Sequence, residues 1–397
     1  MSNIYDGVRI IDFTSNAAGP FCTAIFADYG AEVIKIEAMK VGDGCRYFPP
    51  VFEGTSLPFM WWNRGKKSII VDLKDPDGAE FIKKLVKTAD VVFEASKPGD
   101  MAKFGLDYES IKAVKEDIIY CSISLNGQTG PKSSYPGYDS IAQARCGSID
   151  LTGEADQPPV LPGLTVADLT TAVFAYGAIT SALFHHERTG VGQAIDLSLV
   201  ECLGSFNSNI ARQAMGIETT RIGNQAKSMA PFGIYNGNGG SVVICAPAAT
   251  PWKNLCAAVG KPEAAEEDWA KDNIARVKNR DKITAFVEDW LKSFDNIDEP
   301  AAILEKAGVP STKILSTEDM LTDEQLLARG YIKEFYPPAN VTSIKSFTGT
   351  RSPLRFSVTQ PEDKVSPMLG EHLHEVLTEV GYSDDEVKRL EDKWLAK

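Results

Sequence analysis

Short apolar segments alternate with amphipathic ones along the first half of the chain. Runs of strand length occur at Val8–Phe13, Ala31–Ile36, Ser68–Leu73, Val91–Glu94, Ile118–Ser124 and Ala194–Leu199. The segments between the runs carry apolar residues at helical spacing, as in Phe21–Tyr29, Pro76–Lys87 and Tyr108–Lys115. Such alternation is typical of a mostly parallel, doubly wound α/β sheet of the Rossmann-like kind, whose ligands bind at the carboxyl ends of the strands.

The pattern changes after a helix predicted at Glu201–Met215. One further strand, Ser241–Pro247, precedes helices predicted at Trp252–Val259, Arg280–Phe294 and Pro300–Ala307. This order predicts a smaller α+β domain inserted into the larger one. We therefore expect residues 1–215 to form the first part of the large domain, 222–316 the small domain, and 317–397 a return segment with the C-terminal part of the large domain.

The longest predicted helix begins after a Pro162-Gly163 breaker and carries one carboxylate, Asp168, in its first turns. Its apolar positions lie among small alanine, threonine and glycine residues, which indicates a helix packed closely on most sides. Neither lysine nor arginine lies close to Asp168 in the sequence. The carboxylate is therefore either a favourable charge at a helix N-terminus or a reactive group that the helix end keeps ionised.

Composition narrows the class of protein. A chain of 397 residues is too long for one ordinary core, which agrees with two domains. The formal charge of −13 argues against nucleic acid or an anionic membrane as partner, although a few local lysines can still bind a small anion. The chain has no uninterrupted apolar run of eighteen residues and no secretory pattern at its start, so we expect a cytoplasmic protein.

The seven cysteines are scattered along the chain and form no C-x-x-C pair. This distribution predicts reduced thiols, mostly in the core, and no metal site.

The first strand, helix and strand form a βαβ unit that ends in Glu37, which is also how a dinucleotide-binding domain begins. An NAD-dependent oxidoreductase would need G-x-G-x-x-G in the first turn, so that the backbone can approach the pyrophosphate. The turn here has Gly19 followed by Pro20. The sequence therefore disfavours a dinucleotide enzyme.

A series of motifs, spread over nearly the whole chain, resembles the class III coenzyme A transferases, the formyl-CoA and crotonobetainyl/carnitine CoA-transferase type. The motifs are Ala18-Gly19-Pro20-Phe21, Gly30-Ala31-Glu32-Val33, Gly127-Gln128-Thr129-Gly130, Gly137-Tyr138-Asp139, Asp168, Thr189-Gly190-Val191-Gly192-Gln193 and Leu369-Gly370-Glu371-His372. The resemblance implies an enzyme that moves coenzyme A from an acyl-CoA to a free carboxylic acid. It also implies an interlocked homodimer, acyl-CoA as substrate with no permanently bound cofactor, and Asp168 as the nucleophile that forms an aspartyl-CoA thioester.

The resemblance also suggests which residues bind coenzyme A: Ala17, Ala18, Lys97, Lys103, Asn126, Gly127 and Tyr138. The small residues would present backbone N–H groups to a developing oxyanion, and the lysines would hold phosphates. On the residues alone, Lys97 and Lys103 are more readily explained as ordinary surface lysines near a Pro98-Gly99 turn.

The chain departs from the family pattern at three places. Ala17 stands where the formyl-CoA enzyme has glutamine, Ala38 stands where it has arginine, and the run of glycines that precedes its small-domain strand is missing, which puts formate and oxalate in doubt as substrates. The related α-methylacyl-CoA racemases pair the aspartate with a histidine in Gly-His-Asp, whereas this chain has Gly137-Tyr138-Asp139. A tyrosine of ordinary pKa is a poor partner for proton exchange, so transfer is favoured over racemisation. The retained aspartate and glycine loops argue against a non-catalytic acyl-CoA binding protein.

Overall fold

The computed structural model describes residues 3–395, which form two compact units. The first unit contains the chain up to Ser148, then Pro162–Ser208, and again from Gln325 onward. The second contains Ile149–Leu161 and Asn209–Glu324. The division differs from the one expected, because the short segment Ile149–Leu161 belongs to the second unit and that unit extends beyond residue 316.

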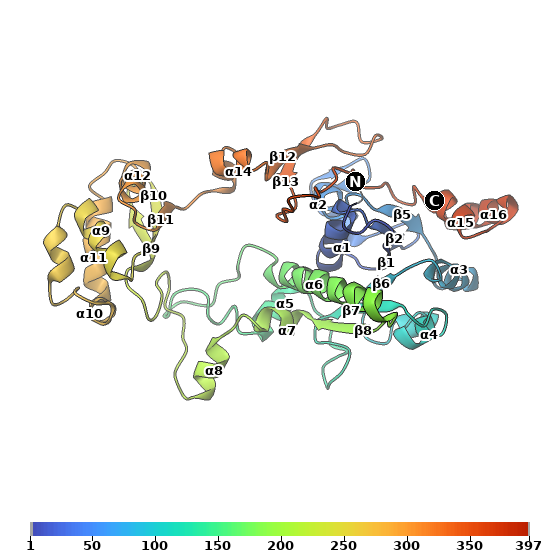
Figure 1. The fold of residues 1–397 in the computed structure, drawn as a ribbon, viewed down its shortest axis with the longest axis horizontal. Helices are drawn as coiled ribbons and strands as arrows, with labels where there is room; N and C mark the ends of the chain where they lie inside the picture. Colours follow the sequence, from blue (N-terminus) through green and yellow to red (C-terminus); the bar gives the residue numbers. More distant parts are fainter. Residues whose placement is uncertain (1–2, 396–397) are drawn as a thin grey trace. The chain divides into compact units, whose positions relative to one another are not determined.

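A six-stranded sheet forms the centre of the first unit (Figure 1). Its strand order is β5-β2-β1-β6-β7-β8, and every neighbouring pair is parallel. The strands are β1 (Arg9–Asp12), β2 (Glu32–Glu37), β5 (Lys67–Ile70), β6 (Val91–Glu94), β7 (Ile119–Ser124) and β8 (Ala194–Ser198). The predicted parallel α/β sheet is confirmed. The strand order reverses between β1 and β6, which is where such sheets usually bind ligands.

Helices cover both faces of this sheet, because successive strand residues point to opposite sides. Ile10 of β1 packs in one core with α1 (Ala18–Asp28) and α6 (Val166–Thr189). Its neighbour Ile11 packs in a second core with helices from the middle and the end of the chain. These helices are α3 (Pro76–Val86), α4 (Tyr108–Lys112), α15 (Leu373–Glu379) and α16 (Asp384–Trp394).

Short elements connect the main ones in the first unit. They are η1 (Gly44–Tyr47), β3 (Val51–Phe52), β4 (Thr55–Ser56), α2 (Leu57–Trp62), η2 (Met101–Phe104), α5 (Asp139–Arg145), α7 (Leu199–Gly204), β12 (Ile332–Phe335) and β13 (Phe347–Thr350). The sequence did not predict α5, although it lies against both α6 and α7.

The helix expected at Glu201–Met215 is wrong as a single element. Helix α7 ends at Gly204, and a separate helix, α8 (Asn209–Ala214), begins in the second unit. The residues between them are poor helix formers, and the side chain of Asn207 donates to the Cys146 carbonyl at 3.1 Å. This tertiary hydrogen bond, to a residue 61 positions earlier in the chain, holds the segment between α7 and α8 outside a continuous helix.

The second unit has its own antiparallel sheet, β11-β10-β9, and its own core. The strands are β9 (Phe232–Gly237), β10 (Gly240–Cys245) and β11 (Ser311–Lys313). The helices are α8, α9 (Ala249–Ala258), η3 (Pro262–Glu266), α10 (Asn273–Lys278), α11 (Arg280–Leu291), α12 (Asp298–Lys306) and α13 (Thr317–Met320), and α14 (Glu324–Ala328) begins at its boundary. This unit therefore combines an antiparallel sheet with helices, as the sequence pattern predicts for an α+β domain.

By length and composition, α6 alone among the described helices could cross a membrane, with a mean hydropathy of 1.3 over its most apolar window. The core helices of soluble proteins pass the same test. Here α6 packs against α1, α5 and α7 as well as β7 and β8, so it is a helix of the first unit's core with one face left uncovered.

Candidate active site

Asp168 lies in the first turn of α6 and is half-buried. The side chain of Thr165, which precedes the helix, makes no capping hydrogen bond. The cap comes from α5, where Asp139 Oδ1 accepts the backbone N–H groups of Ala167 at 2.7 Å and of Asp168 at 3.1 Å. The amide donors at the start of α6 are therefore bonded to a second carboxylate.

This arrangement changes the electrostatics expected at the helix end. Burial, and then the negative charge of Asp139, raise the pKa of Asp168 from 3.8 to about 6. The sequence suggested that the helix end keeps this carboxylate ionised, but two of the N–H groups that would do so are bonded to Asp139. Asp168 is thus ionised at neutral pH and more basic than an ordinary aspartate.

Helix α1 packs against α6 in the core of the first unit. The rings of Phe26 and Tyr176 contact each other with centroids 4.8 Å apart. No side chain caps α1 at Ala17. The first turn of α1 therefore keeps backbone N–H groups that its N-cap side chain does not bind, on a helix that contacts α6.

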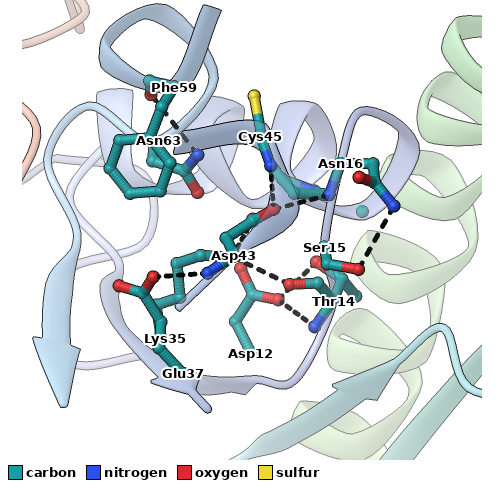
Figure 2. Close-up of polar contacts among 12 residues, drawn as sticks. Asp12, Thr14, Ser15, Asn16, Lys35, Glu37, Asp43, Cys45, Phe59 and Asn63 are labelled. Atoms are coloured by element: carbon teal, nitrogen blue, oxygen red, sulfur yellow. Dashed lines mark hydrogen bonds and ion pairs between the residues drawn. The ribbon is translucent and has the colours of Figure 1, made fainter. Parts of the chain in front are cut away.

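A tight contact fixes this turn. A Cβ atom on Gly19 would lie 2.2 Å from the Cβ of Thr14, so only glycine fits against the preceding loop. The carbonyl of Thr14 accepts from the Lys35 ammonium at 2.8 Å, and its backbone N–H donates to Asp12 Oδ1 at 2.8 Å. The buried side chains of Asp12 and Lys35 thus hold the loop between β1 and α1 (Figure 2).

The groups that hold the loop belong to a buried network of alternating charges at the ends of β1 and β2. Lys66 contacts Asp12 at 3.0 Å, Lys35 contacts Asp43 at 2.8 Å, and Arg46 contacts Glu37 at 2.6 Å. Burial raises the pKa of Asp12 and the ammonium groups of Lys66 and Lys35 lower it, with a net fall from 3.8 to about 2. Every charge in the network has a partner, as buried charges require.

Asp43 connects this network to the loop that follows β1. Its Oδ1 atom accepts the backbone N–H groups of Asn16 at 3.0 Å and of Cys45 at 2.8 Å (Figure 2). Asn16 has a positive φ of 64°, which asparagine tolerates better than most residues. The loop geometry before α1 is therefore specified by side chains from two strands.

A cavity of about 550 Å³ opens at the carboxyl ends of β1, β2, β5 and β6, and we call it the strand-end cavity. It is lined by Phe13–Ser15, Lys35–Met39, Gly42–Gly44, Val71–Lys74, Ser96, Met101 and Phe104. Lys74 is exposed at its rim, and the structure shows no ion pair of its ammonium with any described residue. The sequence reading missed Lys74, although it follows the end of a predicted strand, where ligands are expected.

The two predicted phosphate lysines lie elsewhere. Lys97 lines a separate cavity of about 310 Å³ that also contains Glu94 and Asp196. Lys103 is largely exposed and pairs with Asp100 at 2.6 Å. Lys103 nevertheless belongs to η2, whose Met101 lines both cavities.

The remaining predicted residues lie in loops at the same edge of the sheet. Asn126 follows β7 and donates to the Lys132 carbonyl at 2.8 Å, and Gly127 has a φ of +83°. Tyr138 precedes α5, directly before Asp139, and is 76% exposed. The structure thus brings Tyr138 to the same helix start as the carboxylate that caps α6. Among residues 3–395 no cluster of histidine, cysteine, aspartate or glutamate is suited to a metal ion.

Known proteins resemble this chain over nearly its whole length. The model of CoA-transferase family III matches residues 5–373. The succinate–glutarate CoA-transferase of Agrobacterium fabrum is 34% identical, with 94% of this chain and 95% of that protein aligned. The succinyl-CoA:glutarate CoA-transferase of Mus musculus is 35% identical, over 97% of this chain and 88% of its own. The crystal structure of a CAIB/BAIF family protein from Brucella suis has a TM-score of 0.84 at 36% identity, covering 96% and 100% of the two chains. This chain therefore belongs to CoA-transferase family III and is an enzyme that moves coenzyme A between an acyl-CoA and a carboxylic acid.

Proposed function

We propose that Asp168 is the nucleophile of this transferase and carries coenzyme A in a covalent aspartyl intermediate. The observation that carries the proposal is a half-buried carboxylate at the start of α6 whose pKa is raised to about 6 by burial and by Asp139. Carboxylates are weak nucleophiles in water because they are strongly hydrated. Partial burial removes part of that hydration while Asp168 stays ionised at neutral pH.

The reaction follows from this role. An Asp168 carboxylate oxygen attacks the carbonyl carbon of the donor thioester, and the C–S bond breaks to release the CoA thiolate. The thiolate then attacks the Asp168 carbonyl carbon of the mixed anhydride, which gives an aspartyl-CoA thioester and releases the donor acid as a carboxylate. The acceptor carboxylate runs the same steps in reverse, so the exchange needs no water.

Each attack places negative charge on a carbonyl oxygen. Preorganised backbone N–H groups are effective donors for such an oxyanion, and losing one costs about 3 to 4 kcal/mol in known enzymes. We assign this task to the first turn of α1, at Ala17 and Ala18, because it has no side-chain cap and belongs to a helix that packs against α6.

We place the nucleotide half of coenzyme A in the strand-end cavity. Its volume of about 550 Å³ suits a ligand of this size, and it lies where the strand order reverses. Lys74 at its rim would supply positive charge for the phosphates.

The substrates we propose are dicarboxylic acids and their CoA thioesters. The names of the two relatives described above both specify succinate or succinyl-CoA with glutarate. A panel of succinyl-CoA and glutaryl-CoA with free monocarboxylic and dicarboxylic acids, read by mass spectrometry, tests this choice.

We also propose a homodimer, interlocked as the family resemblance implies. One face of α6 with its neighbours carries exposed apolar side chains, among them Leu164 at 74%, Val173 at 60% and Phe206 at 66% exposure. They line an apolar hollow of about 750 Å³. Patches of this kind are typical of subunit interfaces.

The experiment that tests the catalytic proposal replaces the nucleophile by its amide. Asp168→Asn keeps the shape of the side chain but cannot form the anhydride or the thioester. We expect transfer to fall by at least about a thousandfold, as for other covalent nucleophiles, with unchanged circular dichroism. Transfer within about tenfold of the parent enzyme would end the assignment.

A further inference from the structure

Gln143 is a fully buried polar side chain on α5 that the reaction outlined above does not use. Its Nε2 donates to Asp139 Oδ2 at 2.5 Å and lies 3.5 Å from the Leu164 carbonyl, just before α6. Its Oε1 is buried and has no hydrogen-bond donor among the described residues. A buried acceptor without a donor is unfavourable. The side chain is therefore oriented by what its amide nitrogen binds, and that partner is Asp139.

Asp139 in turn connects Gln143 to the catalytic helix. It is 8% exposed, and its second carboxylate oxygen accepts the N–H groups of Ala167 and Asp168. The chain of contacts runs from Gln143 through both oxygens of Asp139 to the backbone of Asp168. Free N–H groups at a helix start stabilise a nearby anion, but here a carboxylate occupies them and brings its own negative charge.

The covalent role proposed for Asp168 is the basis for a second assignment. We propose that Gln143 and Asp139 are positioning residues, which hold the first turn of α6 and keep a negative charge beside the nucleophile. When the aspartyl-CoA thioester forms, the negative charge of Asp168 leaves with the released carboxylate. The repulsion between Asp139 and Asp168 is then relieved, so Asp139 favours the intermediate over the free carboxylate.

No other charge in the described part of the chain complicates the electrostatics at Asp168. The elements packed against α6 are α1, α5, α7, β7 and β8. Among their side chains, Asp139 is the charged group that acts on the Asp168 carboxyl. The other charged groups on these elements are Asp28 of α1, Arg145 of α5, Glu201 of α7 and Asp196 of β8, and none of them contributes to the raised pKa of Asp168. The thiols of Cys22 on α1 and Cys202 on α7 are neutral near pH 7, because burial raises their pKa.

Two variants separate the charge from the hydrogen bond. Asp139→Asn removes the charge and sets an amide nitrogen against Gln143 Nε2. The double variant Asp139→Asn/Gln143→Glu restores the hydrogen bond with reversed polarity and moves the charge from position 139 to position 143, one helical turn along α5. A matched control is Asp272→Asn, because Asp272 also accepts a backbone N–H at a helix start, that of α10.

The primary readout is the titration of the Asp168 carboxyl in the ligand-free enzyme. Carbon-13 NMR monitors this titration, and the signal of Asp168 is identified because it is missing from the spectrum of Asp168→Asn. We expect the midpoint to fall by about one pH unit in Asp139→Asn, and to lie between that value and the parent in the double variant. We expect kcat to be highest in the parent, lower in the double variant and lowest in Asp139→Asn, and KM to stay within about threefold of the parent value. The control variant Asp272→Asn should match the parent in both the titration midpoint and kcat.

The outcomes are distinct. The positioning role would be overturned if the titration midpoint of Asp168 were unchanged in Asp139→Asn. It would also be overturned if the losses of kcat among the variants were explained by their melting temperatures alone. Should the single variant not fold, the double variant carries the test, because a midpoint equal to the parent's would likewise overturn that role. The titration does not depend on catalysis. If Asp168→Asn still transferred coenzyme A, the covalent mechanism would fail while the effect of Asp139 on Asp168 remained measurable.

Discussion

At the scale of single residues, the site is built around two carboxylates that meet at one helix start. Asp139 caps α6 from outside, and Asp168 lies within its first turn. Like charges this close oppose each other's ionisation, which is the reason, after burial, that the pKa of Asp168 rises to about 6. The folded enzyme therefore holds the ionised Asp168 carboxylate in an unfavourable environment.

Because ionised Asp168 is unfavourable in the folded state, we predict that Asp168→Asn is more stable than the parent by an amount that depends on pH. The carboxyl binds a proton more tightly in the folded state, at a pKa of about 6, than in the unfolded state, at 3.8. The parent therefore loses stability as the pH rises from about 4 to 6, and the full loss persists above that window. We expect the variant to be more stable by about 2 kcal/mol at pH 7 and by almost nothing at pH 4, measured by urea unfolding. A gain of equal size at both pH values would contradict this explanation; Asp295→Asn, at an exposed position, is the control.

Lys74 allows a second test at this scale. A phosphate contact acts in the ground state and transition state alike, so Lys74→Ala should raise the KM for acyl-CoA and leave kcat nearly unchanged. An exposed contact is worth less than about 1 kcal/mol, so we expect a rise of about threefold to fivefold. Lys103→Ala is the comparison, because Lys103 already pairs with Asp100. A larger rise for Lys103 than for Lys74 would move the phosphates away from the strand-end cavity.

At the scale of elements, the proposed chemistry belongs to the starts of α1 and α6. The charged network at the ends of β1 and β2 fixes the loop before α1, and α5 fixes the start of α6. Neither start is capped by the side chain of its own N-cap residue. Each helix start is therefore positioned by tertiary contacts.

Gly19→Ala tests this view for α1. The added methyl would meet the side chain of Thr14 at 2.2 Å, so the first turn of α1 must shift away from its loop. We expect kcat to fall by about a hundredfold, because small misplacements of an oxyanion donor are costly. The double variant Gly19→Ala/Thr14→Gly removes the clash and should regain most of the activity. Activity of the single variant equal to the parent's would show that this turn takes no part.

The sequence predicts the elements of the parallel sheet well, because strands buried on both faces read as unbroken apolar runs. It points to Asp168 as the proposed nucleophile only through the family resemblance. It does not reveal α5, whose seven residues carry no clear apolar period, nor the cap that Asp139 supplies across a gap of many residues. Contacts between positions far apart in the chain, such as Lys66 with Asp12, leave no local signal for the same reason.

At the scale of the whole molecule, the chain enters the second unit twice, at Ile149–Leu161 and at Asn209–Glu324, and returns to the first unit at Gln325. The exposed apolar face over α6 predicts a stable homodimer. If the subunits are interlocked, they separate only by unfolding, whereas an ordinary dimer dissociates on dilution. We expect mass photometry at nanomolar protein to show only the dimer, with full activity in parallel. A folded, active monomer would rule out the interlocked arrangement and leave the role of Asp168 intact.

The proposed mechanism depends above all on the covalent intermediate, which intact-protein mass spectrometry can detect. Incubation with acyl-CoA and no acceptor acid should add the mass of coenzyme A, less one water, to the chain. Borohydride or hydroxylamine should then modify the peptide that contains Asp168, and Asp168→Asn should show neither change. A parent enzyme that transfers coenzyme A at full rate with no adduct on any peptide, or with the adduct on a residue other than Asp168, would contradict the mechanism.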